Sequence, residues 1–254
     1  MDLVLDLLGD FAGLLFVLFF GGLMIVLAVA GKNRPGRNLR DIPAFTRLRR
    51  AVGLAVEAGT RIHLSLGRGN LTGLQGGSVL IGLTMLERCS RAASVSDRPP
   101  IATSGDATVT ILSQDTLNDT YRALGAESQY DPSNGRLSGL TPFAYAAGAV
   151  PVIHDENVAV NVLAGHFGSE AALLTEAAER TNGLTIAGSD SLTGQAVLYA
   201  TAQEALVGED LYAGGAYLGA APMHAASLRA QDIIRWLIIL ITLIGSLAKL
   251  GGLW

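Results

Sequence analysis

Two long apolar runs stand near the ends of the chain and bracket a region in which polar positions recur. The first run, Phe11 to Gly31, contains no charged residue. At about 1.5 Å of helical rise per residue it is long enough to cross a hydrocarbon core of roughly 30 Å. It also lacks the polar face of a helix in a soluble core. We therefore expect residues 11–31 to span a membrane, with residues 1–10 as a tail outside it.

A cleaved signal peptide is the competing interpretation of the first run. A signal peptide needs positive charge before its apolar stretch, whereas Asp2, Asp6 and Asp10 precede this one. The run is also too long, and KNRPGR follows it instead of a small-residue cleavage site. The pattern favours an anchor.

The second run lies within residues 229–254 and has an uncharged core from Trp236 to Ala248. A core of this length also fits a buried or interfacial helix. Four residues suited to the membrane interface flank it: Arg235, Lys249, Trp236 and Trp254. Long basic side chains reach the headgroups and tryptophans favour both interfaces. We expect residues 229–254 to form a second span.

The charge around the two runs predicts their orientation. Seven basic residues follow the first run, opposed by Asp41: Lys32, Arg34, Arg37, Arg40, Arg47, Arg49 and Arg50. Arg229 and Arg235 precede or open the second. We expect the membrane to be the cell (inner, cytoplasmic) membrane. The positive-inside rule then predicts that the central domain is cytoplasmic and that both termini lie on the outer side. We expect residues 32–50 to be a basic juxtamembrane linker that contacts anionic lipid; an RNA-binding patch is the alternative.

Between the runs, residues 51–228 have the size of one domain and alternate strand-like and helix-like patterns. Strands are expected at Arg61–Leu66, Ile101–Thr103, Asn157–Leu163 and Leu184–Ala187. Helices are expected at Gln75–Ala93, from Asp106 to Leu124, from Thr141, from Ser169 to Asn182, after Ser189 or Asp190, and from about Met223. Tyr130–Gly139 has turn composition. This order predicts an α/β domain with a mostly parallel sheet flanked by helices, bracketed by N- and C-terminal transmembrane helices.

Composition narrows the class of protein. Half of the residues are hydrophobic and 16% are charged, against roughly 25% charged in an average soluble domain. The net charge of −4 gives no basic field for nucleic acid, so we expect no nucleic-acid partner. The single Cys89 excludes an intramolecular disulfide. No two histidines have the helical spacing of metal ligands, and we expect no metal site.

A glycine-rich loop, Gly67-Arg68-Gly69-Asn70-Leu71-Thr72-Gly73, follows the first expected strand. It is not the phosphate loop of nucleoside triphosphatases, because no lysine follows the glycines. It also misses the dinucleotide fingerprint, since its third glycine comes one residue late. The alternative is an ordinary turn in which glycines permit tight packing.

Polar residues follow all four expected strands, where the carboxyl ends of parallel strands share one edge of a sheet. Helix N-termini at such an edge favour anions. The candidate ligand-binding residues are Arg68, Gly69, Asn70, Asp106, His166, Ser169, Asp190 and Ser191. The alternative is that Asp106, Ser169 and Asp190 are helix N-caps. The sequence identifies neither a catalytic residue nor a cofactor.

The segment from Leu137 to Leu228 has few charges, and Arg180 is its only lysine or arginine. Many small residues with scattered tyrosines suit close packing between subunits. We therefore expect a homo-oligomer that associates through this half. A well-buried domain interior is the alternative.

Several runs resemble a family of uncharacterised prokaryotic membrane proteins of Chloroflexi-like bacteria and some archaea. They are VEAGTRIHLSLGRGNLTGLQG, RPPIATSGDA, LTPFAYAAG, HDENVAVNVLAGHFG and IAGSDS. The resemblance covers nearly the whole chain and implies two membrane helices around a central domain. It implies no activity, cofactor or catalytic residue.

Two functional hypotheses follow. The first is a membrane-anchored protein whose cytoplasmic domain self-assembles into a homo-oligomeric scaffold. The second is a membrane-tethered enzyme or sensor that binds a small anionic ligand, such as a nucleotide or phosphorylated metabolite, at the strand edge.

Overall fold

The computed structural model describes residues 2–31 and 39–251. These residues form two compact units. One is the central unit, residues 40–218, and the other combines the two terminal segments.

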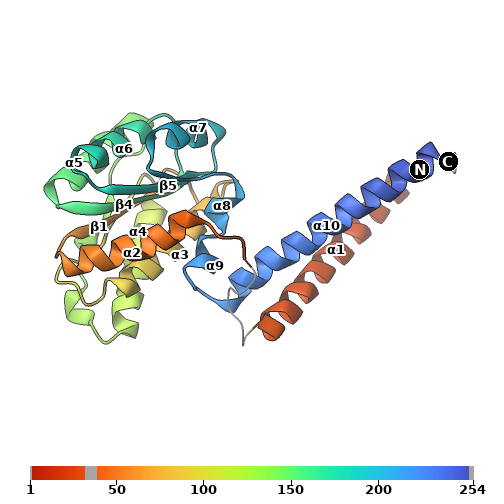
Figure 1. Ribbon diagram of the computed structural model, residues 1–254, viewed down its shortest axis with the longest axis horizontal. Helices are drawn as coiled ribbons and strands as arrows, with labels where there is room; N and C mark the ends of the chain where they lie inside the picture. Colours follow the sequence, from red (N-terminus) through yellow and green to blue (C-terminus); the bar gives the residue numbers. More distant parts are fainter. Residues whose placement is uncertain (1, 32–38, 252–254) are drawn as a thin grey trace. The chain divides into compact units, whose positions relative to one another are not determined.

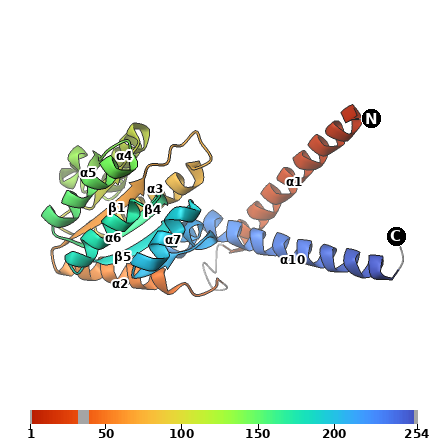
Figure 2. The same cartoon turned by 90° about the horizontal axis from the view of Figure 1, so that it is seen from above.

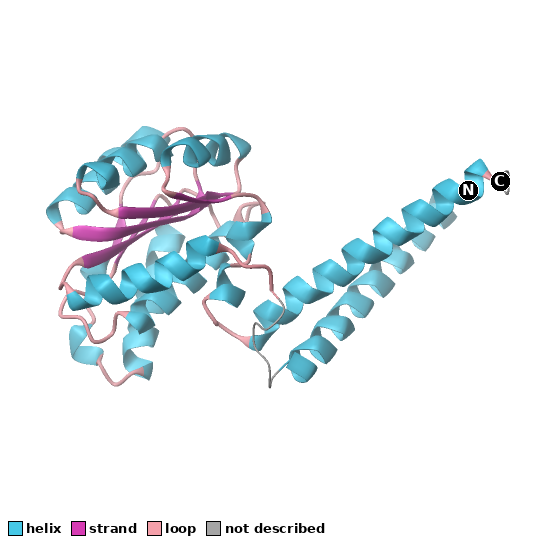
Figure 3. Ribbon diagram, in the orientation of Figure 1, coloured by secondary structure: helices cyan, strands magenta, loops and turns pink. Residues whose placement is uncertain are grey.

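The central unit is built on a six-stranded parallel sheet (Figure 3). Its strands are β1 Arg61–Gly67, β2 Ile101–Ser104, β3 Gly135–Leu137, β4 Val158–His166, β5 Leu184–Ser189 and β6 Glu204–Leu206. Their order across the sheet is β3-β2-β1-β4-β5-β6, and all neighbours are parallel. The predicted α/β fold with a parallel sheet is confirmed.

Helices cover both faces of the sheet (Figure 1). One face carries α2 Pro43–Glu57, α3 Gly76–Ala92 and α4 Ala107–Ala123; the other carries α5 Pro142–Asp155, α6 Ala171–Arg180 and α7 Leu192–Thr201. Seen from above, α5, α6 and α7 follow one another across the strands (Figure 2). Short helices complete the unit: η1 Glu127–Gln129, η2 Pro132–Asn134, α8 Glu209–Tyr212 and α9 Gly214–Tyr217.

This strand order contains a topological switch point between β1 and β4. The chain winds outward from β1 through β2 to β3, returns through α5, and winds outward again from β4 through β5 to β6. In doubly wound sheets the carboxyl ends of the strands at such a point are where ligands bind. Part of the core lies between this sheet and α5, α6 and α7, where Leu163, Phe167 and Leu174 are fully buried.

The two ends of the central unit meet. Arg40 forms an ion pair with Asp210, and the Tyr217 hydroxyl donates a hydrogen bond to the Arg40 carbonyl oxygen. The rings of Phe45 and Tyr217 stack with centroids 5.0 Å apart. Arg47 pairs with Glu204. The start of the unit is therefore fastened to β6, α8 and α9.

The terminal unit consists of α1 Asp2–Gly31 and α10 Pro222–Leu250, which contact each other. Phe11–Gly31 and Pro222–Leu250 are both long and apolar enough to cross a membrane, and their apolar windows are not buried in the structure. The expected apolar helices at the two ends are thus present, and helix α1 already begins at Asp2.

Several elements were not predicted from the sequence, among them α2, β3, β6 and the short helices η1, α8 and α9. Helix α2 begins inside the expected linker, because Phe45, Leu48 and Val52 form a buried stripe between its arginines. Strands β3 and β6 have three residues each and lie at the edges of the sheet. The prediction that Ser189 or Asp190 caps the next helix is wrong, since the cap of α7 is Ser191. Lys32, Arg34 and Arg37 lie outside the described residues.

Candidate functional site

The carboxyl ends of β1 and β4 approach each other closely at the switch point. Gly67 ends β1 with a φ of 69°, and a Cβ at this position would lie 2.4 Å from the carbonyl oxygen of His166. Only glycine tolerates both the left-handed conformation and this proximity. The Gly67 N–H donates to the Tyr145 hydroxyl at 3.3 Å, which fixes the start of the loop.

Three backbone N–H groups in or directly after the glycine loop are used by the protein itself. The Arg68 N–H donates to the His166 carbonyl oxygen at 3.0 Å. The Gly73 N–H donates to Asn70 Oδ1 at 2.7 Å, and the Gly76 N–H to the Gly73 carbonyl oxygen at 3.1 Å. A phosphate cradle needs free N–H groups that converge on one point. These donors hold the loop in shape. This agrees with the absence of the dinucleotide-binding glycine pattern from the sequence.

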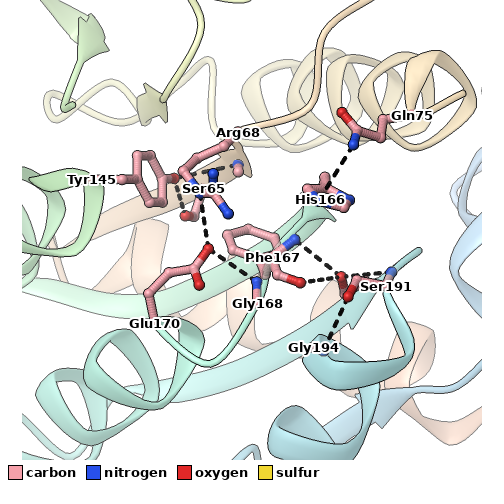
Figure 4. A network of polar contacts seen from close by, with 12 residues as sticks. Ser65, Arg68, Gln75, Tyr145, His166, Phe167, Gly168, Glu170, Ser191 and Gly194 are labelled. Carbon is pink, nitrogen blue, oxygen red and sulfur yellow. Dashed lines mark hydrogen bonds and ion pairs between the residues drawn. The ribbon is translucent and has the colours of Figure 1, made fainter. Parts of the chain in front are cut away.

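Arg68 is held at the end of β1 by a buried carboxylate (Figure 4). Its Nε lies 3.0 Å from Oε1 of Glu170, whose side chain is 1% exposed. The same oxygen accepts the Gly168 N–H at 3.0 Å. Burial raises the pKa of Glu170, but hydrogen bonds from backbone N–H groups and the guanidinium outweigh burial and lower it. Within the described chain, the two terminal nitrogens of Arg68 have no partner.

His166 is held by a carboxylate in turn. Its Nδ1 lies 2.6 Å from Oδ1 of Asp190, and Ser78 Oγ donates to Oδ2 of Asp190 at 2.7 Å. An ionised carboxylate only accepts hydrogen bonds, so Nδ1 is the donor, and in the tautomer with one ring proton the lone pair is on Nε2. The Gln75 amide nitrogen lies 3.4 Å from this Nε2 (Figure 4).

Three residues of this cluster were missed from the sequence. Gln75 and Ser78 begin α3, and Tyr212 belongs to α8. The Tyr212 ring lies against Gly77, and burial followed by the negative charge of Asp190 raises the pKa of its phenol. In the sequence, two polar residues spaced three apart after the glycine loop could have indicated Gln75 and Ser78. Nothing local predicts Tyr212, which is distant in sequence.

Comparison with known families gives one match. Residues 8–252 match the family described as a domain of unknown function, DUF6754. The chain belongs to the DUF6754 family. Comparison with curated proteins and with solved structures gives no match. The resemblance to an uncharacterised family is confirmed.

Beneath the edge, the DUF6754 sheet contains a buried polar network. His63 Nδ1 lies 2.7 Å from Asn161 Oδ1, and His63 Nε2 lies 2.8 Å from Thr103 Oγ1. The Tyr145 hydroxyl contacts Thr103 and Ser65 as well as the Gly67 N–H. Burial lowers the pKa of His63 to about 4, so this histidine is neutral in the folded protein. This network holds the end of β1, and with it the start of the glycine loop, in position.

The structure does not bring all of the other candidate ligand-binding residues to one place. Asp106 caps α4 by accepting the Val109 N–H at 3.0 Å, and Ser191 caps α7 through the Gly194 N–H at 3.5 Å. Asn70 closes its own turn, and Ser169 is exposed. Asp190, however, binds His166 and is not a cap. The structure thus joins His166 to Asp190, with Gly69 packed against both His166 and Gln75.

The acidic and histidine side chains are spaced too widely for an obvious cation site. Among the described residues, no group of three or more His, Cys, Asp or Glu could hold a metal ion. The chemistry available at this edge of the DUF6754 domain is that of a guanidinium, an imidazole and the carboxylates that orient them.

Proposed function

We propose that the α/β domain of this DUF6754 protein binds a small anionic ligand at the switch point between β1 and β4. The single observation that carries the proposal is the hydrogen bonding of the Arg68 guanidinium. Its Nε is fixed by the buried Glu170, while its two terminal nitrogens have no protein partner in the described chain. A guanidinium oriented in this way presents a planar pair of donors that fits a carboxylate or a phosphate.

The surrounding charges favour a ligand with a single anionic group. Glu170 already neutralises Arg68, and Asp190 and Asp106 add negative charge at the same edge of the sheet. A polyphosphate would be repelled by these carboxylates. Small carboxylic acids and monophosphate esters are therefore the proposed ligand class.

Thermal unfolding of the detergent-solubilised full chain tests this proposal. A panel of small carboxylic acids, sugar monophosphates and nucleoside monophosphates is added one at a time. A ligand at a hundred times its dissociation constant stabilises the fold by about 2.7 kcal/mol. The variant R68M/E170Q removes the buried charge pair as a unit and should lose this stabilisation.

The matched control is R122M, which removes an arginine that is 67% exposed and paired with Glu127 at 3.8 Å. This variant should retain the full response to the ligand. The proposal fails when no panel compound stabilises the wild type, or when R68M/E170Q responds to the compound as the wild type does.

We further propose that the protein is held at a membrane by α1 and α10 and self-associates through the α5–α6 surface. A groove of about 370 Å³ between these helices is bordered by Phe143 and Leu173, which are 67% and 41% exposed. Large exposed apolar side chains around a groove are typical of protein contacts. Mass photometry in mild detergent should give a multimer for the wild type and smaller particles for F143E. A monomeric wild type would exclude this association.

A further inference from the structure

We infer that the switch-point edge is an active site in which His166 exchanges protons with the bound ligand. The inference rests on the proposed function, because it concerns the same small acid that Arg68 would hold. It goes further by assigning acid–base chemistry to the site and a role to each residue of the His166 cluster.

Asp190 fixes the orientation of the His166 imidazole. Asp190 Oδ1 lies 2.6 Å from His166 Nδ1, and Asp190 Oδ2 accepts a hydrogen bond from Ser78 at 2.7 Å. Ser78 is fully buried in the first turn of α3. Both carboxylate oxygens are therefore occupied, and the ring is fixed between β5 and α3. A carboxylate on Nδ1 stabilises the imidazolium that forms when Nε2 takes a proton.

In the described chain, the other ring nitrogen of His166, Nε2, has only a weak contact with the protein. Its protein neighbour is the Gln75 amide nitrogen at 3.4 Å, beyond the usual range of roughly 2.7–3.2 Å for a hydrogen bond. The His166 side chain is 25% exposed. A ligand group can replace this weak contact at little cost. Nε2 is thus the proton-accepting atom available to a ligand.

The other histidine of the sheet shows what a structural role looks like. His63 is fully buried, and both of its ring nitrogens have close partners, Asn161 at 2.7 Å and Thr103 at 2.8 Å. His166 has one close partner and one weak contact, and it lies at the edge where the topology places ligands. The contrast separates a histidine that packs from one that reacts.

His166 lies close to the backbone of Arg68. The Arg68 N–H donates to the His166 carbonyl oxygen at 3.0 Å, so the two residues are adjacent across β1 and β4. A Cβ at Gly69 would lie 3.2 Å from the His166 Cβ, so the loop lies directly against the histidine. Their side chains extend on either side of the end of β4 (Figure 4). Both side chains therefore start from the same edge of the sheet, at which the acid is proposed to bind.

The proposed step moves a proton without any change of oxidation state. In a carbon acid, the C–H bond beside a carbonyl group breaks, its electron pair stays on the ligand, and the proton passes to Nε2 and returns to another ligand atom. In an ester, a water molecule gives its proton to Nε2 while its oxygen bonds to the acyl or phosphoryl centre. The leaving oxygen then departs with that proton.

Isotope uptake distinguishes these steps. Each panel acid that stabilises the wild-type chain is incubated with it in D₂O and, separately, in water labelled with oxygen-18, and is then analysed by mass spectrometry. We expect at least one acid to gain deuterium at carbon or oxygen-18 in its product. H166Q should lower this rate about 100-fold or more, while the acid still stabilises the variant. H154Q, which alters an exposed histidine on α5, should have no effect.

Asp190 is a positioning residue and has its own readout. D190N should slow the isotope uptake while the acid still stabilises the variant, and the ¹⁵N resonances of His166 should show loss of the Nδ1-protonated tautomer. Recovery of every stabilising acid without label, or equal labelling by H166Q, overturns the inference and leaves the binding proposal standing. A panel in which nothing stabilises the chain overturns both.

Discussion

Arg68 Nε and Glu170 Oε1 lie 3.0 Å apart at the switch point, and the glutamate is the more deeply buried partner, with a side chain 1% exposed against 20% for the arginine. The folded protein should therefore lose more stability when the guanidinium is removed than when the carboxylate is removed. Loss of the arginine leaves a buried charge without its partner, which is the costlier change.

The first prediction concerns this asymmetry. R68M should lower the free energy of unfolding by about 3 kcal/mol, because the Glu170 carboxylate loses its cation. R68M/E170Q should recover most of that loss, since a glutamine still accepts the Gly168 N–H. Denaturant unfolding of the four members of this cycle gives the coupling directly. Strictly additive effects of the two substitutions would contradict the dependence of Glu170 on Arg68.

The second prediction is a pH dependence set by His63. Its pKa is lowered from 6.5 to about 4 in the fold, chiefly by burial. Between these values the unfolded chain binds a proton that the folded chain does not, so the free energy of unfolding rises with pH. The total change from pH 4 to 6.5 is about 3 kcal/mol. Denaturant unfolding at several pH values should show a smaller slope for H63Q, and an identical slope would contradict the assignment.

The third prediction compares two glycines with the same backbone conformation. Gly67 and Gly59 have φ of 69° and 63°, but a Cβ at Gly67 meets the β4 backbone, whereas one at Gly59 meets open space. G59A should cost about 1 kcal/mol for the left-handed conformation. G67A should cost about 3 kcal/mol or more, because the strand end must also shift. Thermal unfolding measures both, and equal losses would show that the approach to His166 does not constrain Gly67.

The fourth prediction concerns membrane orientation. A reporter active only in the cytoplasm, inserted between Asp131 and Gly135, should be active, and one fused after residue 254 should be silent. The reason is the excess of basic residues that flank the central domain. The reverse pattern would place the domain outside, and activity of both fusions would mean that α10 does not span.

The fold could be predicted where the local pattern was strong. Arg61–Leu66 alternates clearly, and Asp106 is followed by helical periodicity, so β1 and α4 match the expectation closely. Strands β3 and β6 could not be predicted in this way. They have three residues each, and pairing with β2 and β5 defines them as strands. Such pairing is a tertiary contact that leaves little trace in sequence.

The candidate site was predicted in part for a similar reason. The parallel sheet places the ends of β1, β4 and β5 at one edge, and this requires only the strand assignments, so the common location of Arg68, His166 and Asp190 could be predicted. The partners of these three residues could not be predicted, because they depend on how the loops fold back onto the sheet. Glu170 and Ser78 read as ordinary helix-start residues in the sequence, and Tyr212 reaches the cluster from the far end of the domain.

The contact between the two ends of the central unit has a mechanical consequence. Residues 40–45 and 210–217 are joined by the Arg40–Asp210 ion pair and by the stacking of Phe45 on Tyr217. Tension applied at either end of the central unit reaches this junction first, and the junction keeps the two ends of the unit together. The Arg47–Glu204 ion pair passes part of such a load to β6, the edge strand of the sheet.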